Sequence, residues 1–461
     1  MFFTFCKFHK LININIMNKF ETENPNLKPQ MDNILQTLFT YTTISEIPKN
    51  FELVQSVNKT FNPDTPKEKE KFKKQLIESS SSLNITKSKF TKYIIYNKVY
   101  TKETKNSLIY NISKIIYFTY RKNFSNILNS IGQKFNCDTG WGCMLRCGQM
   151  ILARGIYKYL KKLGNSTKSS LLQSIYYFFE NPFSFENMPD NFINMMNYYL
   201  NVWYKEHKND IILKLIYPPF SIKSLCSVGR ICNKEVGNWF SDVNACYIFK
   251  IINQYFHLFK ELKIFTFQSC IDINEIIDNC FEKESNIYNK DDFILKENEE
   301  KLYFTYKGII FVSVRLGLNE IPKEYHIPIL KVFSCKNCIG FIGGKDKRAF
   351  YFIGYDENGH LLYVDPHFTN ETLQNVNENN FVNNYLIKDI YSISLKKMSS
   401  AFTIGFIFRN FNEYKQLIDF LKTYTEQQFP CFGISGLKKN KYNQKNLLRI
   451  EKKMFNDIDD F

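Results

Sequence analysis

The sequence predicts an α+β fold rather than a doubly wound parallel sheet. Helical periodicity comes first in the globular part of the chain, and strand patterns follow later. The clearest strand signal is a hairpin, in which the apolar runs 350–355 and 360–364 flank an Asn-Gly turn at 358–359. Helices followed by strands, without βαβ alternation, are typical of the α+β class.

Length and composition indicate a folded chain. It has 461 residues, of which 44% are hydrophobic and 16% aromatic, enough for one large domain or two ordinary ones. The formal net charge of +16 could suggest a nucleic acid or an anionic membrane as partner. The lysines are scattered, however, and no arginine-rich stripe or nucleic-acid motif appears. We therefore predict no nucleic-acid partner.

The cysteine pattern and the N-terminus predict a soluble cytoplasmic protein with free thiols. Twelve cysteines at irregular spacing in a long chain do not resemble a short disulfide scaffold. Lys7 and Lys10 interrupt the apolar start of the chain, so a signal peptide is not expected. No run approaches the roughly 18 apolar residues that span a bilayer.

The chain divides into three predicted parts. Residues 1–105 have the prolines and mixed charges of a partly disordered N-terminal extension. Residues 106–430 form the predicted globular domain, in which the highly charged segment 282–301 is expected to be an exposed insertion. Residues 431–461 are expected to be a flexible C-terminal tail.

Within the domain, apolar spacing predicts particular elements. Met144, Ile151 and Leu160 belong to a helical pattern that predicts a buried amphipathic helix over 143–161. A second helix is expected from Asp242 to about Phe259. The segment 304–316 alternates loosely and contains β-branched residues, which favours a strand.

Cys143 is the candidate nucleophile. Residues 138–149 have the sequence DTGWGCMLRCGQ, in which a Gly-Trp-Gly turn places Cys143 at the start of the predicted helix. Free N–H groups and the helix dipole at that position favour a thiolate. A lone cysteine at a helix start is more simply a buried structural residue. Cys147, one turn later, fits that simpler role.

Among six histidines, His367 is the candidate base. His9 lies in the extension, His207 is flanked by charges, and His257 lies on an apolar helical face, while His326 and His360 lie near turns without an obvious orienting carboxylate. His367 ends the run YVDPH at a strand end, two residues after Asp365. If both residues remain extended, their side chains share one face. The carboxylate can then fix the imidazole tautomer.

A cysteine at a helix N-terminus and a histidine on a later strand is the arrangement of papain-like cysteine peptidases. The sequence therefore predicts a papain-like fold, with a helical half that carries Cys143 and an antiparallel sheet that carries Asp365 and His367.

Six motifs in order make a closer resemblance: FTYRKNF at 118–124, DTGWGCMLRCGQM at 138–150, RLGL at 315–318, GFIGGK at 340–345, YFIGY at 351–355 and YVDPH at 363–367. Over residues 110–425 the chain closely resembles the autophagins, the cysteine peptidases of autophagy. The long block around Cys143 makes chance agreement negligible.

The resemblance implies an activity, partners and further site residues. Autophagins cleave a ubiquitin-like autophagy modifier after its C-terminal glycine, and release the modifier from phosphatidylethanolamine. Matching positions give Cys143, His367 and Asp365 as the triad and Tyr120 as an oxyanion-hole residue. We also expect no cofactor or metal, peripheral contact with autophagic membranes through the modifier, and a monomer.

Substrate binding is assigned on the same resemblance to Trp141, Trp239 and Arg315. Trp141 and Trp239 would form a flat slot that admits only glycine, because larger residues would clash. From the sequence alone, Trp239 is more simply a core aromatic.

The chain also departs from the family pattern. Asp346 stands where the family's mobile loop commonly has proline, which puts gating by residues 345–348 in doubt. Residues 125–130 replace a shorter Gly/Pro-rich link.

The sequence leaves three alternatives open. Cys335 and Cys338 form a C-x-x-C pair, which could belong to a zinc module but needs two further ligands. A transglutaminase-like acyltransferase would use the same Cys-His-Asp triad. A non-catalytic modifier-binding protein would retain the fold without turnover.

The end of the chain carries a candidate docking motif. Phe455 and Ile458, beside Asp457 and Asp459, resemble short segments by which autophagy proteins bind the modifier. A frayed amphipathic tail is the simpler alternative.

Overall fold

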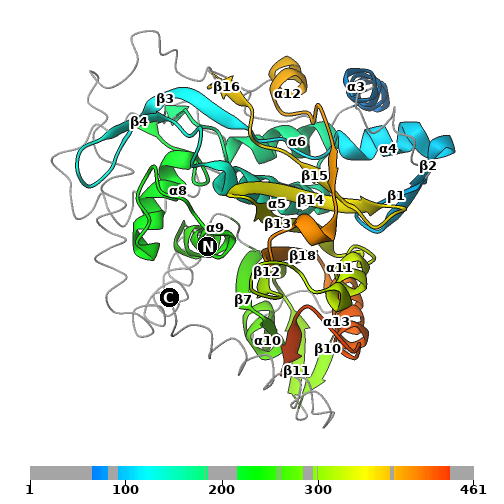
Figure 1. Cartoon of the computed structure of the whole chain (residues 1–461). Coiled ribbons are helices and arrows are strands. Elements are labelled where there is room, and N and C mark those ends of the chain that lie inside the picture. The colour runs from blue at the N-terminus through cyan, green and yellow to red at the C-terminus, as the bar shows by residue number, and fades with distance from the viewer. Residues whose placement is uncertain are drawn as a thin grey trace, which may run out of the picture.

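The computed structural model describes residues 65–80, 92–181, 183–184, 215–256, 259, 261–283, 294–297, 300–373 and 378–436. The predicted tail motif and His9, His207 and His257 lie outside these residues. The described part is a mixed sheet with helices on both faces (Figure 1). None of its helices combines the length and apolar character needed to cross a bilayer.

The main sheet in the described residues has nine strands. Seven form a path, in the order β17 (Tyr391–Ile393), β15 (Leu361–Val364), β14 (Arg348–Asp356), β13 (Cys338–Lys345), β18 (Ala401–Phe408), β12 (Lys307–Arg315) and β7 (Leu262–Gln268). Neighbouring strands are antiparallel except β12 and β7, which are parallel. The prediction of an antiparallel sheet is therefore correct except for the edge strand β7, which runs parallel to β12.

The two faces of the sheet carry separate hydrophobic cores. One core holds α5 (Cys143–Lys162) and α9 (Asp242–Phe256), and the other holds α10 (Ile273–Cys280), α11 (His326–Val332) and α13 (Phe411–Thr425). In β12, Ile309 and Phe311 face the first core, whereas Ile310 and Val312 face the second. Burial on both faces explains why the sequence of this strand alternates only loosely.

Further helices and small sheets surround these layers. The other helices are α3 (Pro66–Ser79), α4 (Lys105–Ile112), α6 (Thr167–Tyr176), α8 (Ile222–Gly229) and α12 (Glu378–Asn384). The small sheets pair β3 (Tyr120–Leu128) with β4 (Lys134–Cys137) and β16 (Thr369–Glu371), β8 (Cys270–Asp272) with β19 (Gly433–Ser435), and β5 (Phe183–Ser184) with β6 (Leu215–Ile216).

The predicted elements agree with the observed ones. The helix expected at 143–161 is α5, whose side chains are buried along most of its length. The helix expected from Asp242 is α9, which is described as far as Phe256. The predicted hairpin is β14 and β15, where Gly359 has φ +75° and its N–H donates to the Asp356 carbonyl at 3.0 Å. The left-handed backbone there is the reason for glycine.

The sheet begins earlier than the domain boundary expected at residue 105. β1 (Lys92–Ile95) and β2 (Lys98–Thr101) form a hairpin, and β1 pairs with β14, where Ile94 lies opposite Tyr355. A Cβ at Gly354 would collide with the Ile94 carbonyl, so this close approach requires glycine. Residues 92–105 therefore belong to the folded unit.

Two other segments contain regular secondary structure. The charged run at 67–74 lies in α3, which starts with a capping box between Thr65 and Glu68 and buries Phe72 and Leu76. Within the predicted insertion 282–301, β9 (Phe281–Lys283), β10 (Ile294–Glu297) and β11 (Glu300–Phe304) form a three-stranded antiparallel sheet.

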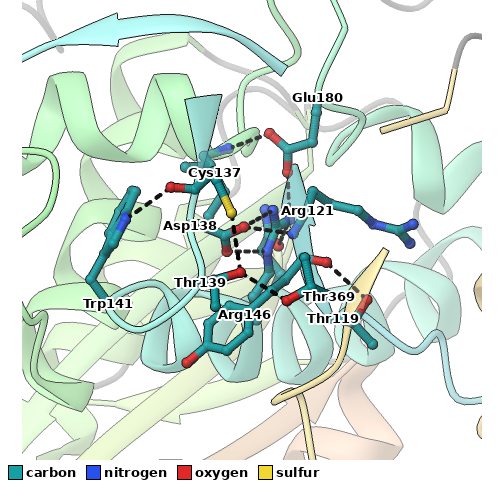
Figure 2. A network of polar contacts seen from close by, with 12 residues as sticks. Thr119, Arg121, Cys137, Asp138, Thr139, Trp141, Arg146, Glu180 and Thr369 are labelled. Carbon is teal, nitrogen blue, oxygen red and sulfur yellow. Dashed lines mark hydrogen bonds and ion pairs between the residues drawn. The ribbon is translucent and has the colours of Figure 1, made fainter. Parts of the chain in front are cut away.

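A buried ionic network fixes the start of α5 (Figure 2). Arg146, only 1% exposed, donates from Nε to the Asp138 carboxylate at 2.8 Å and from Nη1 to Glu180 at 2.5 Å. Burial opposes the charged guanidinium, but Asp138 and Glu180 outweigh it and raise the pKa of Arg146. The cation on the first turn of the helix is thereby tied to carboxylates before and after it.

Asp138 also shapes the turn that leads into the helix. Its carboxylate accepts the backbone N–H of Arg121 at 2.6 Å, and its carbonyl accepts the N–H of Gly142 at 2.9 Å. A Cβ at Gly142 would collide with this carboxylate, which explains the second glycine of the Gly-Trp-Gly turn. The network therefore sets where Cys143 stands.

We expect Arg146→Met to destabilise the protein by about 3–5 kcal/mol, because Asp138 and Glu180 would remain buried without their cation. Chemical denaturation followed by fluorescence measures the change. The matched control is Lys162→Met, an exposed cation on the same helix, which should change stability by less than about 0.5 kcal/mol. A loss in Arg146→Met as small as in the control would contradict the role of the network.

Candidate active site

Cys143 is the first residue of α5, and Gly142 occupies the N-cap position. The N-cap side chain therefore supplies no acceptor, and the first N–H groups of the helix stay available to a bound oxygen. Gly140, in the turn before, has φ +89°, a left-handed conformation suited to glycine. Cys143 itself is completely buried. A substrate can reach its sulfur only if covering groups move aside.

His367 and Asp365 come from the sheet and lie beside Cys143, which belongs to the helical layer. Both residues follow β15, and the imidazole Nδ1–H of His367 donates to Asp365 Oδ1 at 2.5 Å. The backbone N–H of His367 donates to the same oxygen at 3.0 Å, which holds the pair in one geometry. The His367 side chain also hydrogen-bonds with Cys143. The structure thus brings the three predicted triad residues together.

The surroundings of His367 and Asp365 favour the charged imidazolium and the charged carboxylate. Burial would lower the pKa of His367, but the hydrogen bonds with Asp365 and Cys143 outweigh it and raise that pKa above its usual value. Burial would raise the pKa of Asp365, but the bonds from His367 and the charge of Arg348 lower it. An imidazolium beside a carboxylate is the state that stabilises a neighbouring thiolate.

Tyr120 lies within this group of residues. It begins β3, is 4% exposed, and its hydroxyl hydrogen-bonds with Cys143. Its ring meets the His367 imidazole edge to face, with the centroids 5.5 Å apart. Burial and the neighbouring Cys143 raise the pKa of Tyr120, so its hydroxyl keeps the proton and can donate. The Tyr120 hydroxyl is therefore a hydrogen-bond donor beside Cys143 and His367.

Two contacts that the sequence did not reveal fix Asp365. Tyr117 donates its hydroxyl to the Asp365 carbonyl at 2.6 Å, and Arg348 donates from Nη2 to Asp365 Oδ2 at 2.8 Å. Arg348 closes the β13–β14 hairpin, in which Asp346 and Lys347 have φ of +50° and +61°. Residues 345–348 therefore form a tight two-residue turn that is tied to the triad carboxylate.

The predicted substrate-binding residues lie in different settings. Trp141 is 8% exposed, donates its indole N–H to the Cys137 carbonyl at 3.1 Å and packs edge to face on Phe135. Trp239 is 38% exposed, so the simpler assignment of a core aromatic is wrong. Arg315 is exposed at the end of β12, and its Nε donates to the Gly317 carbonyl at 3.4 Å.

The remaining cysteines and histidines have other surroundings. Burial raises the pKa of Cys147 well above the usual value, as expected for an inert thiol. Contrary to the sequence analysis, His360 does have a carboxylate nearby, since its Nδ1 lies 3.4 Å from Asp356. Among the described residues no group of three His, Cys, Asp or Glu side chains is placed to hold a metal, and both Cys335 and Cys338 are buried.

Asp138 and Arg146 have positioning roles that were not predicted from the sequence. Both appeared only as letters of the motif around Cys143. An acidic residue five positions before the nucleophile and an arginine three positions after it fall on either side of the helix start. That spacing was the one sign in the sequence that the two side chains could form an ion pair around the start of the helix.

Comparisons with known proteins agree with this geometry. The family described as the peptidase C54 catalytic domain matches residues 105–420. Cysteine protease ATG4C of Xenopus laevis is 28% identical over 348 residues, which cover 69% of this chain and 71% of the relative. Cysteine protease ATG4C of Homo sapiens is 25% identical over 374 residues, covering 74% and 78%, and ATG4A of Homo sapiens is 26% identical over 321, covering 66% and 71%.

The family match spans well over half of the chain, and the relatives are named as cysteine proteases. These matches favour the peptidase over the acyltransferase and the non-catalytic alternatives. The chain therefore belongs to the peptidase C54 family, the autophagins, and is a cysteine peptidase.

Proposed function

We propose that this peptidase hydrolyses the bond that follows the C-terminal glycine of a ubiquitin-like autophagy modifier, with Cys143 as nucleophile, His367 as base and Asp365 as the group that orients it. The observation that carries the proposal is the hydrogen-bonded chain from Asp365 through His367 to Cys143 at the N-terminus of α5. Such a chain activates a thiol for acyl transfer.

The chemistry follows from these positions. The Cys143 thiolate attacks the glycine carbonyl carbon, and the carbonyl oxygen becomes an oxyanion. The Tyr120 hydroxyl and the free N–H groups at the start of α5 donate to that oxygen. His367 then gives its proton to the leaving amine, and a thioester remains on Cys143. Water, deprotonated by His367, attacks the thioester and restores the thiol with release of the glycine carboxylate.

One site can process both forms of the modifier. In the precursor, the glycine carbonyl is joined to the next residue by a peptide bond. In the lipidated form it is joined to the amine of phosphatidylethanolamine, which is also an amide. The same attack and the same proton transfer break either bond, so we propose that both are substrates.

Glycine specificity would come from Trp141 and Trp239. The exposed Trp239 is available to cover an entering strand, whereas Trp141 is held by Cys137 and Phe135. Arg315, exposed beyond β12, would contact the body of the modifier. The triad comes from one chain, so we propose a monomer that acts in the cytoplasm and reaches autophagic membranes only through the modifier.

The direct test is incubation of the purified protein with a modifier precursor that carries a C-terminal reporter. We expect free reporter and a modifier that ends in glycine, without any amine acceptor in the buffer. Release that depends on an added amine would indicate an acyltransferase instead.

Cys143→Ala should abolish reporter release, a loss of several orders of magnitude in kcat/KM, since no other group can form the thioester. Cys147→Ala is the matched control. Its thiol is buried four residues along the same helix, and its loss should leave much of the activity. Equal and complete loss in both variants would show that their roles have been misassigned.

His367→Ala should slow alkylation of Cys143 by iodoacetamide at pH 7 at least tenfold, because the imidazolium no longer balances the thiolate. The raised pKa of His367 means that the wild-type imidazolium persists above pH 6.5, and its effect fades as pH rises through that pKa. The difference between the variants should therefore narrow at high pH. If the ratio of the wild-type and His367→Ala alkylation rates stayed constant from pH 6 to 10, the proposed ion pair would be wrong.

Trp239→Ala should widen specificity and lower the rate. With the indole absent, precursors whose glycine is replaced by alanine or serine should be cut faster relative to glycine, while kcat for glycine falls. The comparison uses kcat/KM for matched precursors. Tyr247→Ala, which removes another partly exposed aromatic, is the control. Unchanged selectivity and rate in Trp239→Ala would mean that this side chain does not meet the substrate.

A further inference from the structure

Two cations that form no ion pair within the described residues lie, with three tyrosine rings, where α4, α5 and the β1–β2 hairpin meet, and we name this group the Arg154 cluster. Its members are Arg154 on α5, Lys114 after α4, and the rings of Tyr96, Tyr100 and Tyr157. Arg154 lies eleven residues beyond Cys143, or about 16 Å along the helix. Figure 1 shows α4 and β2 side by side, away from the β3–β4 hairpin. The cluster is thus separate from the active site.

Arg154 is the most unusual member. Its Nε and Nη1 atoms are buried and have no hydrogen-bond partner among the residues that the structure describes. The guanidinium faces the Tyr96 ring at 4.6 Å and the Tyr157 ring at 5.6 Å from the ring centroids. Aromatic faces stabilise a cation but accept no conventional hydrogen bond from it. A buried donor left unsatisfied costs about 1–3 kcal/mol, and more when it is charged.

Arg146, on the same helix, shows what satisfies a buried arginine in this protein. It binds the carboxylates of Asp138 and Glu180. Arg154 has no such ion pair in the described part of the chain. In the described residues the guanidinium of Arg154 therefore lacks a bonded anion.

Lys114 is the second basic side chain of the cluster, and it has no ion pair within the described residues. Its ammonium lies 3.5 Å from the centre of the Tyr110 ring and donates to the Asn111 side chain at 3.3 Å. Burial, together with the positive charges of Arg154, Lys98, Lys161 and Lys73, lowers the pKa of Lys114 to about 7. Lys158, one turn beyond Arg154, has a pKa lowered to about 7 for the same two reasons, burial and neighbouring cations that include Arg154.

We propose that the Arg154 cluster binds a phosphate-bearing anion through the free N–H groups of Arg154 and the ammonium of Lys114. Phosphate oxygens accept two parallel bonds from a guanidinium, and a multiply charged group can offset several cations at once. Free phosphate compounds and phosphorylated lipid headgroups share this chemistry.

The test is isothermal titration of the full-length protein with inorganic pyrophosphate in phosphate-free buffer. Wild type should bind at one site per chain, and Arg154→Gln and Lys114→Gln should each weaken the affinity about tenfold or more. Lys162→Gln, which removes an exposed cation from the same helix, controls for net charge and should bind as wild type does. Cleavage of the reporter precursor should be unchanged in all three variants without anion.

Stability distinguishes a binding site from a structural cation. Without anion, Arg154→Gln should melt no lower than wild type, because it removes an unsatisfied buried charge. Pyrophosphate should then raise the melting temperature of wild type and not that of the variant. If Arg154→Gln does not fold, Lys114→Gln alone provides the comparison. Absence of binding, or equal binding by wild type and the Arg154 and Lys114 variants, would overturn the proposal.

A second arm identifies the source of the phosphate. Phosphatidylcholine vesicles with 10% phosphatidylinositol 4-phosphate are compared with vesicles of phosphatidylcholine alone by sedimentation. Sedimentation with the phosphorylated lipid that is lost in Arg154→Gln assigns a headgroup. Pyrophosphate binding without sedimentation assigns a free anion. Sedimentation that Arg154→Gln leaves intact would place lipid binding elsewhere and count against the cluster.

Discussion

The buried ion pair between Asp138 and Arg146 is the interaction on which the active site depends. It joins Asp138, two positions before the Gly-Trp-Gly turn, to the first turn of α5, and Cys143 lies between the two residues in the sequence. Charged groups this deep are costly unless each is fully bonded, and here Glu180, Gln149 and the Arg121 backbone complete the set. In return for this cost in stability, the network holds the start of the helix in one position. A nucleophile misplaced by 1 Å would lose much of its activity.

The site is completed across the boundary between helix and sheet. Asp365 and His367 leave β15, which is held in register by β14 and β17, while Cys143 belongs to the helical layer. Tyr117 and Tyr120 connect the two, since one bonds the Asp365 carbonyl and the other touches both His367 and Cys143. Packing of α5 on the sheet therefore determines whether the triad is aligned. Arg348 adds a surface contact that links the β13–β14 turn to the same carboxylate.

Much of this arrangement was predictable from the sequence. The helix at 143–161, the Asn-Gly hairpin and the α+β class follow from periodicity and turn chemistry, and Cys143, Asp365 and His367 stood out by position. Other features were not predictable. The pairing of β1 with β14 joins residues far apart in the chain. The sequence carries only one indication of it, Gly354, and a single glycine does not identify a pairing partner. Trp239 seemed a core aromatic because exposure cannot be judged from residue type. Arg348 and Arg146 looked like ordinary arginines until their partners were placed.

The central claim is that Cys143, aligned by this network, forms the covalent bond to the modifier. A modifier that carries a vinyl sulfone electrophile in place of its C-terminal glycine carboxylate tests it directly. Intact-mass analysis and peptide mapping after reaction should show one modifier per chain, attached at Cys143 alone. Attachment at Cys147 or any other cysteine, or no adduct with a folded protein, would contradict the account.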